Sequence, residues 1–277
     1  MPLGDAGQAL GFVYVVAIGC LATPCVANRR WGRLTRNRDK IDMVISEDQE
    51  MQWGSGSLWS LGVKRLADLI GAAVLLIVLS PLFLLIALLV KVTSHGPVFF
   101  RQERAGFEGR VFRPFKFRTM RGDRKPDPKE IVPLTHGDIT TIGRFLRRYK
   151  LDELPQLLNV LAGDMSIVGP RPTLPDQVAA YDAFRRQRLL VKPGITGLAQ
   201  VYSSALDSWD ERILYDVAYV RRCGFLLDGL ILARTLMTVA LGEQRTRRSF
   251  VDSALAKHVE IPEGFDTSKS TRAGSVR

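Results

Sequence analysis

The sequence has few of the residues that build disulfide frameworks and metal clusters. Only three cysteines and three histidines occur among 277 residues. Cys20 and Cys25 lie in one apolar run, Cys223 stands alone, and no histidine lies at metal-ligand spacing from a cysteine or another histidine. We therefore expect no disulfide framework and a reducing, cytosol-facing location.

Two common glycine-rich nucleotide motifs are also missing. The sequence contains no GxxxxGK[ST] loop, and Gly54 and Gly56 belong to no strand-to-helix unit. A bound nucleotide would therefore be held by other groups. A disordered chain is excluded as well, because 46% of the residues are hydrophobic and the length suffices for one good-sized domain with appendages.

Positive charge is in excess and is concentrated in two places. The net charge is +11, and residues 101–150 hold 14 lysines and arginines against six acidic residues. A second basic cluster lies between Arg29 and Lys40. Such clusters indicate an anionic partner, which could be nucleic acid, a phospholipid surface or a phosphorylated substrate.

A first apolar segment, residues 10–27, is followed rather than preceded by basic residues. A secretory signal carries its positive charge before the apolar run. The reverse order predicts a retained transmembrane helix within residues 1–28, with its C-terminal end in the cytoplasm. Residues 29–60 then form a basic and polar linker.

A second apolar segment, Leu69–Val90, has 22 residues without a charge and is long enough to span a bilayer. Basic residues flank both ends, with Lys64 and Arg65 before it and Lys91 after it. A crossing helix would place one basic flank on the outer side, against the positive-inside tendency. A helix that enters and leaves on the same face satisfies both flanks.

Ser80 and Pro81 lie at the middle of this segment. Proline lacks the amide hydrogen and clashes with the preceding turn, so a bend is expected here. The Ser80 hydroxyl can satisfy a backbone carbonyl that the proline leaves unpaired in lipid. A kinked spanning helix and a re-entrant helix both contain such a bend, and the flanking charges favour re-entry.

Two strand-like runs follow, PVFFRQER and RVFRPFKFRTM, separated by the glycine-bearing AGFEG. This pattern predicts a β-hairpin. Alternation places Lys116 and Arg118 on one face, two residues apart, where they suit a phosphate. An amphipathic hairpin with solvated basic residues explains the same pattern.

Two turns and two helices are predicted later in the chain. GPRP at Gly169–Pro172 indicates a rigid turn, and KPGITGLAQV at Lys192–Val201 indicates a turn that leads into a short strand. A helix is predicted over Trp209–Arg222. The apolar run after it contains Asp228 and Arg234, which predicts a buried or interfacial helix rather than a span.

Two adjacent carboxylates, Asp152 and Glu153, precede a helical pattern of leucines that ends at Gly163. They therefore occupy the first turn of a helix. One explanation is capping, because acidic residues satisfy free amides at this end. A cap needs one carboxylate, however, and Pro155 fixes the backbone of the same turn without costing a hydrogen bond.

Nearby arginines favour a second explanation, a reactive pair. Arg147 lies five residues upstream of Asp152, and Arg171 follows the Gly-Pro turn. A carboxylate among arginines at a helix start keeps a low pKa and stays ionised, and phosphates bind the same groups. It can attack phosphorus once arginines and a divalent metal reduce its charge. The residues themselves leave both explanations open.

Four motifs carry a resemblance to a known family: SHGPVFFRQERAG, KFRTM, LDELPQLLNVLAGDMSIVGPRP and KPGITGLAQV. Over about Lys64–Leu241 the sequence resembles the bacterial sugar transferases, monotopic phosphoglycosyl transferases that begin lipid-linked glycan assembly. The family transfers a sugar 1-phosphate from a nucleotide diphosphate sugar, usually a UDP-sugar, to polyprenyl phosphate and releases the nucleoside monophosphate.

The resemblance implies roles for the acidic pair. Asp152 would be the nucleophile of a covalent phosphosugar intermediate, and Glu153 would position groups or handle the acceptor proton. Magnesium would lie between the diphosphate and Asp152. Lys150, just before the pair, departs from the serine of many relatives. The implied phosphate- or substrate-binding residues are Arg147, Arg171, Lys116 and Arg118.

The resemblance also implies an architecture. The fold would be a small α+β, membrane-associated monotopic domain with a β-hairpin and several amphipathic helices. The N-terminal transmembrane helix predicted from the residues departs from the many minimal relatives that start at the re-entrant helix. A re-entrant helix would cover residues 61–96, the catalytic part 97–243 and a flexible tail 244–277. Ser80 and Pro81 match the break of the re-entrant helix. The positions at its membrane entry are Lys64, Arg65 and Asp68.

The implied partners are a UDP-sugar, polyprenyl phosphate and the cytoplasmic leaflet of a bacterial inner membrane, with the catalytic domain facing the cytoplasm. No nucleic acid is expected, a homo-oligomer is compatible, and the expected pathway is exopolysaccharide or capsule assembly. Two alternatives stay open. One is a glycosyl transferase that releases UDP, and the other is a non-catalytic membrane scaffold whose basic surface binds anionic lipid.

Overall fold

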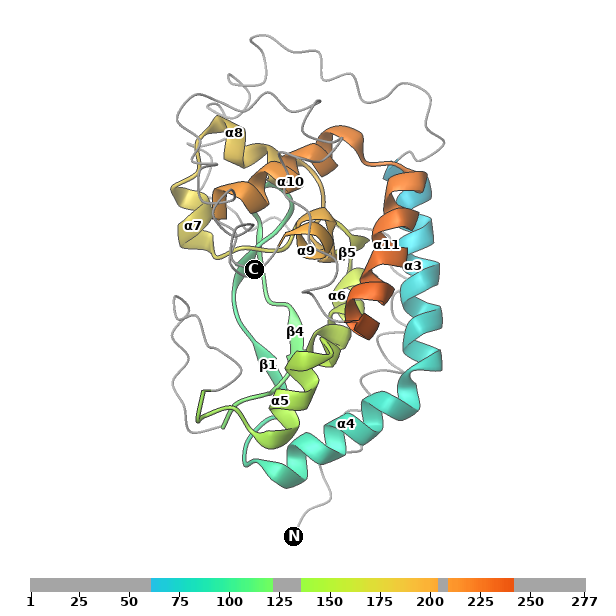
Figure 1. Ribbon diagram of the computed structural model, residues 1–277, viewed down its shortest axis with the longest axis vertical. Helices are drawn as coiled ribbons and strands as arrows, with labels where there is room; N and C mark the ends of the chain where they lie inside the picture. Colours follow the sequence, from blue (N-terminus) through green and yellow to red (C-terminus); the bar gives the residue numbers. More distant parts are fainter. Residues whose placement is uncertain (1–60, 122–135, 204–208, 242–277) are drawn as a thin grey trace, which may run out of the picture. The chain divides into compact units, whose positions relative to one another are not determined.

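The computed structural model describes residues 61–121, 136–203 and 209–241 (Figure 1). The predicted N-terminal transmembrane helix, the linker at 29–60 and the tail at 244–277 lie outside these residues. Within them the fold mixes helices with short strands, as expected for an α+β domain.

Two helices joined at a sharp bend begin the described chain. Helix α3 spans Leu61–Val78 and α4 spans Ser80–Thr93, with a bend of 63° between them. Pro81 offers no amide hydrogen to the Ile77 carbonyl, and the Ser80 hydroxyl donates to that carbonyl at 2.8 Å. The break is therefore where the sequence predicts it, with the predicted partner.

This bent pair is the one candidate for a membrane segment among the described helices. No single helix there is both long and apolar enough to cross a bilayer, whereas α3 and α4 together have the required length and composition. Many of their apolar side chains are exposed, including Ile77, Val78, Leu88 and Val92.

A two-part hairpin follows α4 and confirms the predicted β-hairpin. Strand β1 (Phe99–Arg101) pairs antiparallel with β4 (Phe115–Phe117), so that Phe100 lies opposite Lys116. Nearer the tip, β2 (Arg104–Ala105) pairs with β3 (Val111–Phe112). The short 3-10 helix η2 (Phe107–Gly109) closes the tip, where Gly109 has a φ of 75°.

The helical segment around the acidic pair is built from three short elements. Helix α5 (Thr141–Arg148) is capped by the Thr140 hydroxyl, which accepts from the Gly143 amide at 2.9 Å. The 3-10 helix η3 (Leu151–Gln156) and helix α6 (Leu157–Ala162) follow. The predicted stop is confirmed, because Gly163 adopts a left-handed φ of 94° at the end of α6.

A parallel strand pair lies beyond α6. Strand β5 (Ser166–Val168) pairs with β6 (Gly194–Thr196). Three short helices form the connection: α7 (Pro175–Ala179), α8 (Ala183–Arg186) and the 3-10 helix η4 (Gln187–Leu190).

The strand predicted after the KPGITG turn is instead inside it. The strand is β6, and the chain after Gly197 forms helix α9 (Leu198–Tyr202). Leu198, Ala199 and Val201 are buried in α9, so the apolar side chains that suggest a strand pack as one face of a helix turn.

The last two helices supply much of the core. Helix α10 spans Trp209–Arg222, as predicted, and its residues 213–220 are all buried. Helix α11 spans Phe225–Leu241 and buries Ile231. Its other apolar side chains are largely exposed, including Phe225, Leu226, Leu236 and Met237. This distribution fits the predicted interfacial helix.

Three charged residues of α3 tie the membrane-candidate helix to the folded domain. Lys64 pairs with Asp228 of α11 at 2.6 Å, and Figure 1 shows these two helices side by side. Asp68 is buried and accepts from the Ile167 amide at 3.0 Å. Arg65 donates to the carbonyls of Val160 and Leu161 at 2.6 and 3.1 Å, near the end of α6.

Candidate active site

The acidic pair lies at the junction between α5 and η3, beneath the hairpin. Lys150 links the two helices in a left-handed conformation, with a φ of 56°, and places Asp152 and Glu153 in the first turn of η3. Strand β4 packs on this turn. Asn159 of α6 holds the strand in place, since its side-chain oxygen accepts from the Phe115 amide at 2.8 Å.

Glu153 is buried and bound by two cations. Lys116 of β4 donates to its carboxylate at 2.6 Å, and Arg171 donates to both carboxylate oxygens, at 2.9 and 3.3 Å. Burial opposes ionisation, but the charges and hydrogen bonds of Arg171 and Lys116 hold the pKa of Glu153 well below its usual value. Glu153 is therefore firmly ionised.

Asp152 is in a different electrostatic environment. Burial and the negative charge of Glu153 raise its pKa, while Lys116, Arg147 and Arg171 act in the opposite direction. The expected low pKa is thus wrong for Asp152. The reason is that Glu153 takes the hydrogen bonds of Lys116 and Arg171, so that Asp152 feels these cations through charge alone.

The four predicted phosphate-binding residues do not all reach the pair. Lys116 and Arg171 contact Glu153 directly. The Arg147 Nε donates to the Thr119 hydroxyl at 2.9 Å, and the arginine charge acts on Asp152. Arg118, in contrast, is buried and donates to the Ser94 carbonyl at 2.6 Å. Arg118 therefore contacts the residue that caps the end of α4.

The model of the bacterial sugar transferase family matches residues 59–242, which include every described element from α3 to α11. This chain belongs to the bacterial sugar transferase family.

Curated relatives support this assignment. The sugar transferase matches an uncharacterized sugar transferase, EpsL, of Bacillus subtilis with 42% identity over 65% of this chain and 89% of the relative. It matches a UDP-glucose:undecaprenyl-phosphate glucose-1-phosphate transferase of Xanthomonas campestris with 47% identity over 65% of this chain and 39% of the relative. The exopolysaccharide production protein ExoY of Rhizobium meliloti is 39% identical over 64% of this chain and 85% of the relative.

The relatives differ in length. The matched segment covers most of EpsL and ExoY but well under half of the Xanthomonas protein. The residues matched by the family model, 59–242, contain the acidic pair and the bent helices.

A metal ion at this site would need ligands from the substrate as well as from the protein. Among the described residues, no group of three or more histidine, cysteine, aspartate or glutamate side chains could hold a metal ion. Glu153 is bound to two cations, which leaves the Asp152 carboxylate as the available oxygen ligand of the pair. One carboxylate fits Mg²⁺, which is commonly bound by one or two carboxylates together with substrate phosphates and water.

Sequence reasoning missed two residues of this site in the sugar transferase. Arg104 of β2 lies close enough for Arg171 and Glu153 to influence it, and burial and the charge of Arg171 lower its pKa. Asn159 joins α6 to the hairpin. The RQER motif could have pointed to Arg104, because it places a basic residue on the arm of the hairpin opposite the arm that carries Lys116.

Proposed function

We propose that this sugar transferase moves a sugar 1-phosphate from a UDP-sugar to polyprenyl phosphate and releases UMP. One observation carries the proposal: the two adjacent carboxylates differ in their hydrogen bonds. Glu153 is bound to Lys116 and Arg171, whereas Asp152, within the described residues, has no hydrogen bond from another side chain. A carboxylate left unbound beside several cations is suited to attack a phosphate.

The proposed reaction has two displacements at one phosphorus atom. An oxygen of Asp152 attacks the phosphorus that carries the sugar, and the bond from this phosphorus to the oxygen shared with UMP breaks. UMP leaves with the electron pair. An oxygen of polyprenyl phosphate then attacks the same phosphorus, the bond to Asp152 breaks, and the free carboxylate and the lipid diphosphate sugar are formed.

The basic residues would bind and orient the phosphates. Arg171 and Lys116 are held by Glu153, so their cations are fixed beside Asp152 before substrate arrives. The low pKa of Glu153 makes it a poor base, which favours positioning over proton transfer as its role. Magnesium, with Asp152 as its protein ligand, would neutralise charge on the diphosphate.

The names of the relatives agree with this proposal. Those of Xanthomonas campestris, Klebsiella pneumoniae and Escherichia coli are named UDP-glucose:undecaprenyl-phosphate glucose-1-phosphate transferases. A relative in Aeromonas hydrophila is named for N-acetylgalactosamine phosphate transfer. The donor class and acceptor class are therefore shared, while the sugar differs among relatives.

We also propose that the protein lies on the cytoplasmic face of a bacterial inner membrane, with α3 and α4 re-entering the leaflet. The exposed apolar side chains of α3, α4 and α11 support this placement, because large apolar patches on a protein surface mark contact sites. Membrane contact would let a water-soluble donor meet a lipid acceptor at Asp152.

The test is a nucleotide-release assay with the purified full-length protein, undecaprenyl phosphate and a panel of UDP-sugars. We expect UMP as the product and, in Asp152→Asn, a loss of rate by a factor of at least about 1,000, as for removal of a nucleophile. UDP as the product would instead support a glycosyl transferase. Unchanged activity in Asp152→Asn would show that Asp152 is not the nucleophile.

A folding control accompanies the Asp152 variant. Burial raises the pKa of Asp152, so the ionised group destabilises the fold at neutral pH, and a neutral amide removes that cost. Asp152→Asn is therefore expected to melt no lower than the parent protein. A lower melting temperature would mean that lost activity reflects misfolding.

A further inference from the structure

A buried arginine lies behind the turn that carries Arg171. Arg188, at 3% exposure in η4, pairs with Asp216 of α10, which is 1% exposed. The Tyr181 hydroxyl accepts from Arg188 at 2.8 Å, and the guanidinium lies over the Trp209 ring at 5.3 Å from its centre. A buried ion pair is weak evidence for stability, which raises the question of what else this one does.

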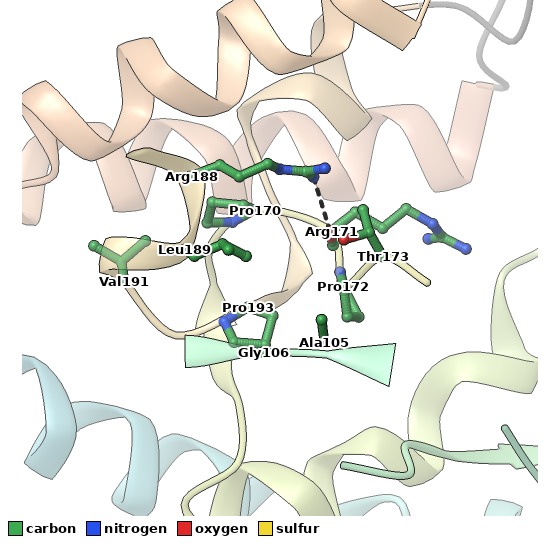
Figure 2. Close-up of a pocket in the computed structure, with 10 residues that line it drawn as sticks. All are labelled: Ala105, Gly106, Pro170, Arg171, Pro172, Thr173, Arg188, Leu189, Val191 and Pro193. Carbon is green, nitrogen blue, oxygen red and sulfur yellow. Dashed lines mark hydrogen bonds between the residues drawn. The ribbon is translucent and has the colours of Figure 1, made fainter. Parts of the chain in front are cut away.

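The same guanidinium reaches the turn itself. Arg188 Nη2 donates to the main-chain carbonyl of Arg171 at 2.9 Å. Figure 2 shows this bond, with the Arg171 side chain extending away from Pro170 and Pro193. The guanidinium of Arg171 then binds Glu153 through two hydrogen bonds. One side chain in the core is thus connected, through one backbone carbonyl, to the candidate active site.

The turn is otherwise held by backbone contacts. Gly169 donates to the Thr196 carbonyl, the Pro170 carbonyl accepts from Gly194, and the Thr173 carbonyl accepts from Ala105, each at 2.8 or 2.9 Å. Prolines on both sides of Arg171 restrict its backbone further. Arg188 adds the side-chain contact at the residue whose own side chain enters the site.

The space between the turn and η4 is not a ligand site. The cleft in Figure 2, lined by Pro170, Pro172 and Leu189 among others, has a volume of about 10 Å³. That volume holds about one water molecule. The turn and η4 are therefore packed closely around the hydrogen bond from Arg188, and no room is left there for substrate.

We propose that Arg188 is a positioning residue for the transferase reaction: it fixes the main chain at Arg171 so that the Arg171 guanidinium meets Glu153 in one geometry. This inference rests on the proposed function, because it assigns Arg171 to the reacting site. Arg188 touches no reacting atom. Misplacement of a binding group by about 1 Å can cost about 100-fold in rate, so such a contact affects turnover.

The first test is a double-mutant cycle in the UMP-release assay. Arg188→Lys keeps a cation beside Asp216 but loses the planar fork that serves several acceptors. We expect its kcat to fall about 10- to 100-fold. Combined with Arg171→Ala, it should cause no further loss, because Arg188 acts through the Arg171 guanidinium, which Arg171→Ala has already removed. Full activity in Arg188→Lys, or multiplying losses in the double variant, would overturn the proposal.

The second test does not depend on activity. Hydrogen exchange in the peptide that contains Gly169, Arg171 and Thr173 should be faster in Arg188→Lys than in the parent. Unchanged exchange there would overturn the proposal. If the parent protein releases no UMP, the proposed function fails, whereas the exchange result still decides whether Arg188 holds the turn.

Two further variants separate positioning from general stability. Arg185→Gln is the matched control, since Arg185 is a neighbour on α8 whose ion-pair partners are Asp182 and Asp210, and it should change neither readout. If Arg188→Lys does not fold, Arg188→Met with Asp216→Asn removes both charges together and leaves no unpaired one. The same losses are expected. Failure of both variants to fold would show that the Arg188–Asp216 pair is needed for the stability of the whole domain, and would overturn the proposal.

Discussion

Asp152 and Glu153 are neighbours in the chain, yet their surroundings shift their pKa values in opposite directions. Two cations bind Glu153 and keep it ionised, and its charge then adds to burial in raising the pKa of Asp152. A carboxylate with a raised pKa is more basic and therefore a better nucleophile once it is ionised. The pair thus differs by environment and not by residue type.

Lys116 offers a test of this arrangement through pH. Its charge lowers the pKa of Asp152, so Lys116→Met should raise that pKa further. Because the proposed reaction uses the ionised form of Asp152, activity should rise with pH through this pKa. The acid limb of kcat/KM for UMP release should therefore move to higher pH in the variant.

The control for this measurement lies on the same hairpin. Arg113 pairs with Glu103 at 2.7 Å on an exposed surface, so Arg113→Gln should leave the acid limb in place. An acid limb in Lys116→Met that stays in place or moves to lower pH would contradict the assigned electrostatics.

At the scale of elements, close backbone contacts join the turn at Gly169 to β6 and to the start of α9. A Cβ atom added to Gly194 would lie 2.1 Å from the Gly169 nitrogen and 2.4 Å from the Thr196 oxygen. Gly197 approaches the Gly169 carbonyl in the same way. Glycine is required here for space and not for a positive φ.

This requirement gives a stability prediction. Gly194→Ala should lower the free energy of unfolding by about 1–3 kcal/mol, because backbone atoms must move to admit the methyl group. The melting temperature would then fall by about 2–4 °C for each kcal/mol. Thermal melts followed by circular dichroism measure this change.

Gly229 is the matched control. A Cβ atom there meets nothing within 4 Å, and the residue lies within α11. Gly229→Ala should therefore be neutral or stabilise by about 0.5–1 kcal/mol. Equal losses in the two alanine variants would show that the close approach of Gly194 to Gly169 is not the cause.

Local patterns in the sequence predicted several elements correctly. The hairpin, the break at Ser80, the stop at Gly163 and helix α10 each follow from residues close together in the chain. The parallel pairing of β5 with β6 could not be predicted this way, because the contact joins strands more than twenty residues apart and each has only three residues.

The site was predictable to a similar degree. The sequence predicted Asp152, Glu153 and Arg171 as site residues, because acidic and basic residues cluster around a helix start. It could not show that Glu153 takes the hydrogen bonds of both Lys116 and Arg171, since that choice depends on the packing of β4 and the Gly-Pro turn. The opposite pKa shifts follow from this packing.

For the whole molecule, the bend between α3 and α4 is compatible with two membrane topologies. A re-entrant pair places both of its ends on one side of the membrane, whereas a kinked span places them on opposite sides. Val63 and Val92 lie near the two ends and are 47% and 75% exposed. Both positions can therefore carry a reporter side chain.

Cysteine labelling decides between these topologies. With the native cysteines changed to serine, Val63→Cys and Val92→Cys should both react with a membrane-impermeant reagent from the cytoplasmic side, in inverted vesicles and not in intact cells. A cysteine variant with retained UMP release serves as the folding control. Labelling of the two positions from opposite sides would establish a span instead.

The hydrogen bonds of Arg65 have a consequence for where chemistry takes place relative to lipid. They join α3 to the end of α6, and α6 follows directly on the turn that bears Asp152. α6 and η3 together form a rigid connection between the membrane-candidate helix and the acidic pair. Under the proposed membrane placement, the depth of α3 in a leaflet would set the height of Asp152 above it, and this height would have to match the level of a lipid phosphate.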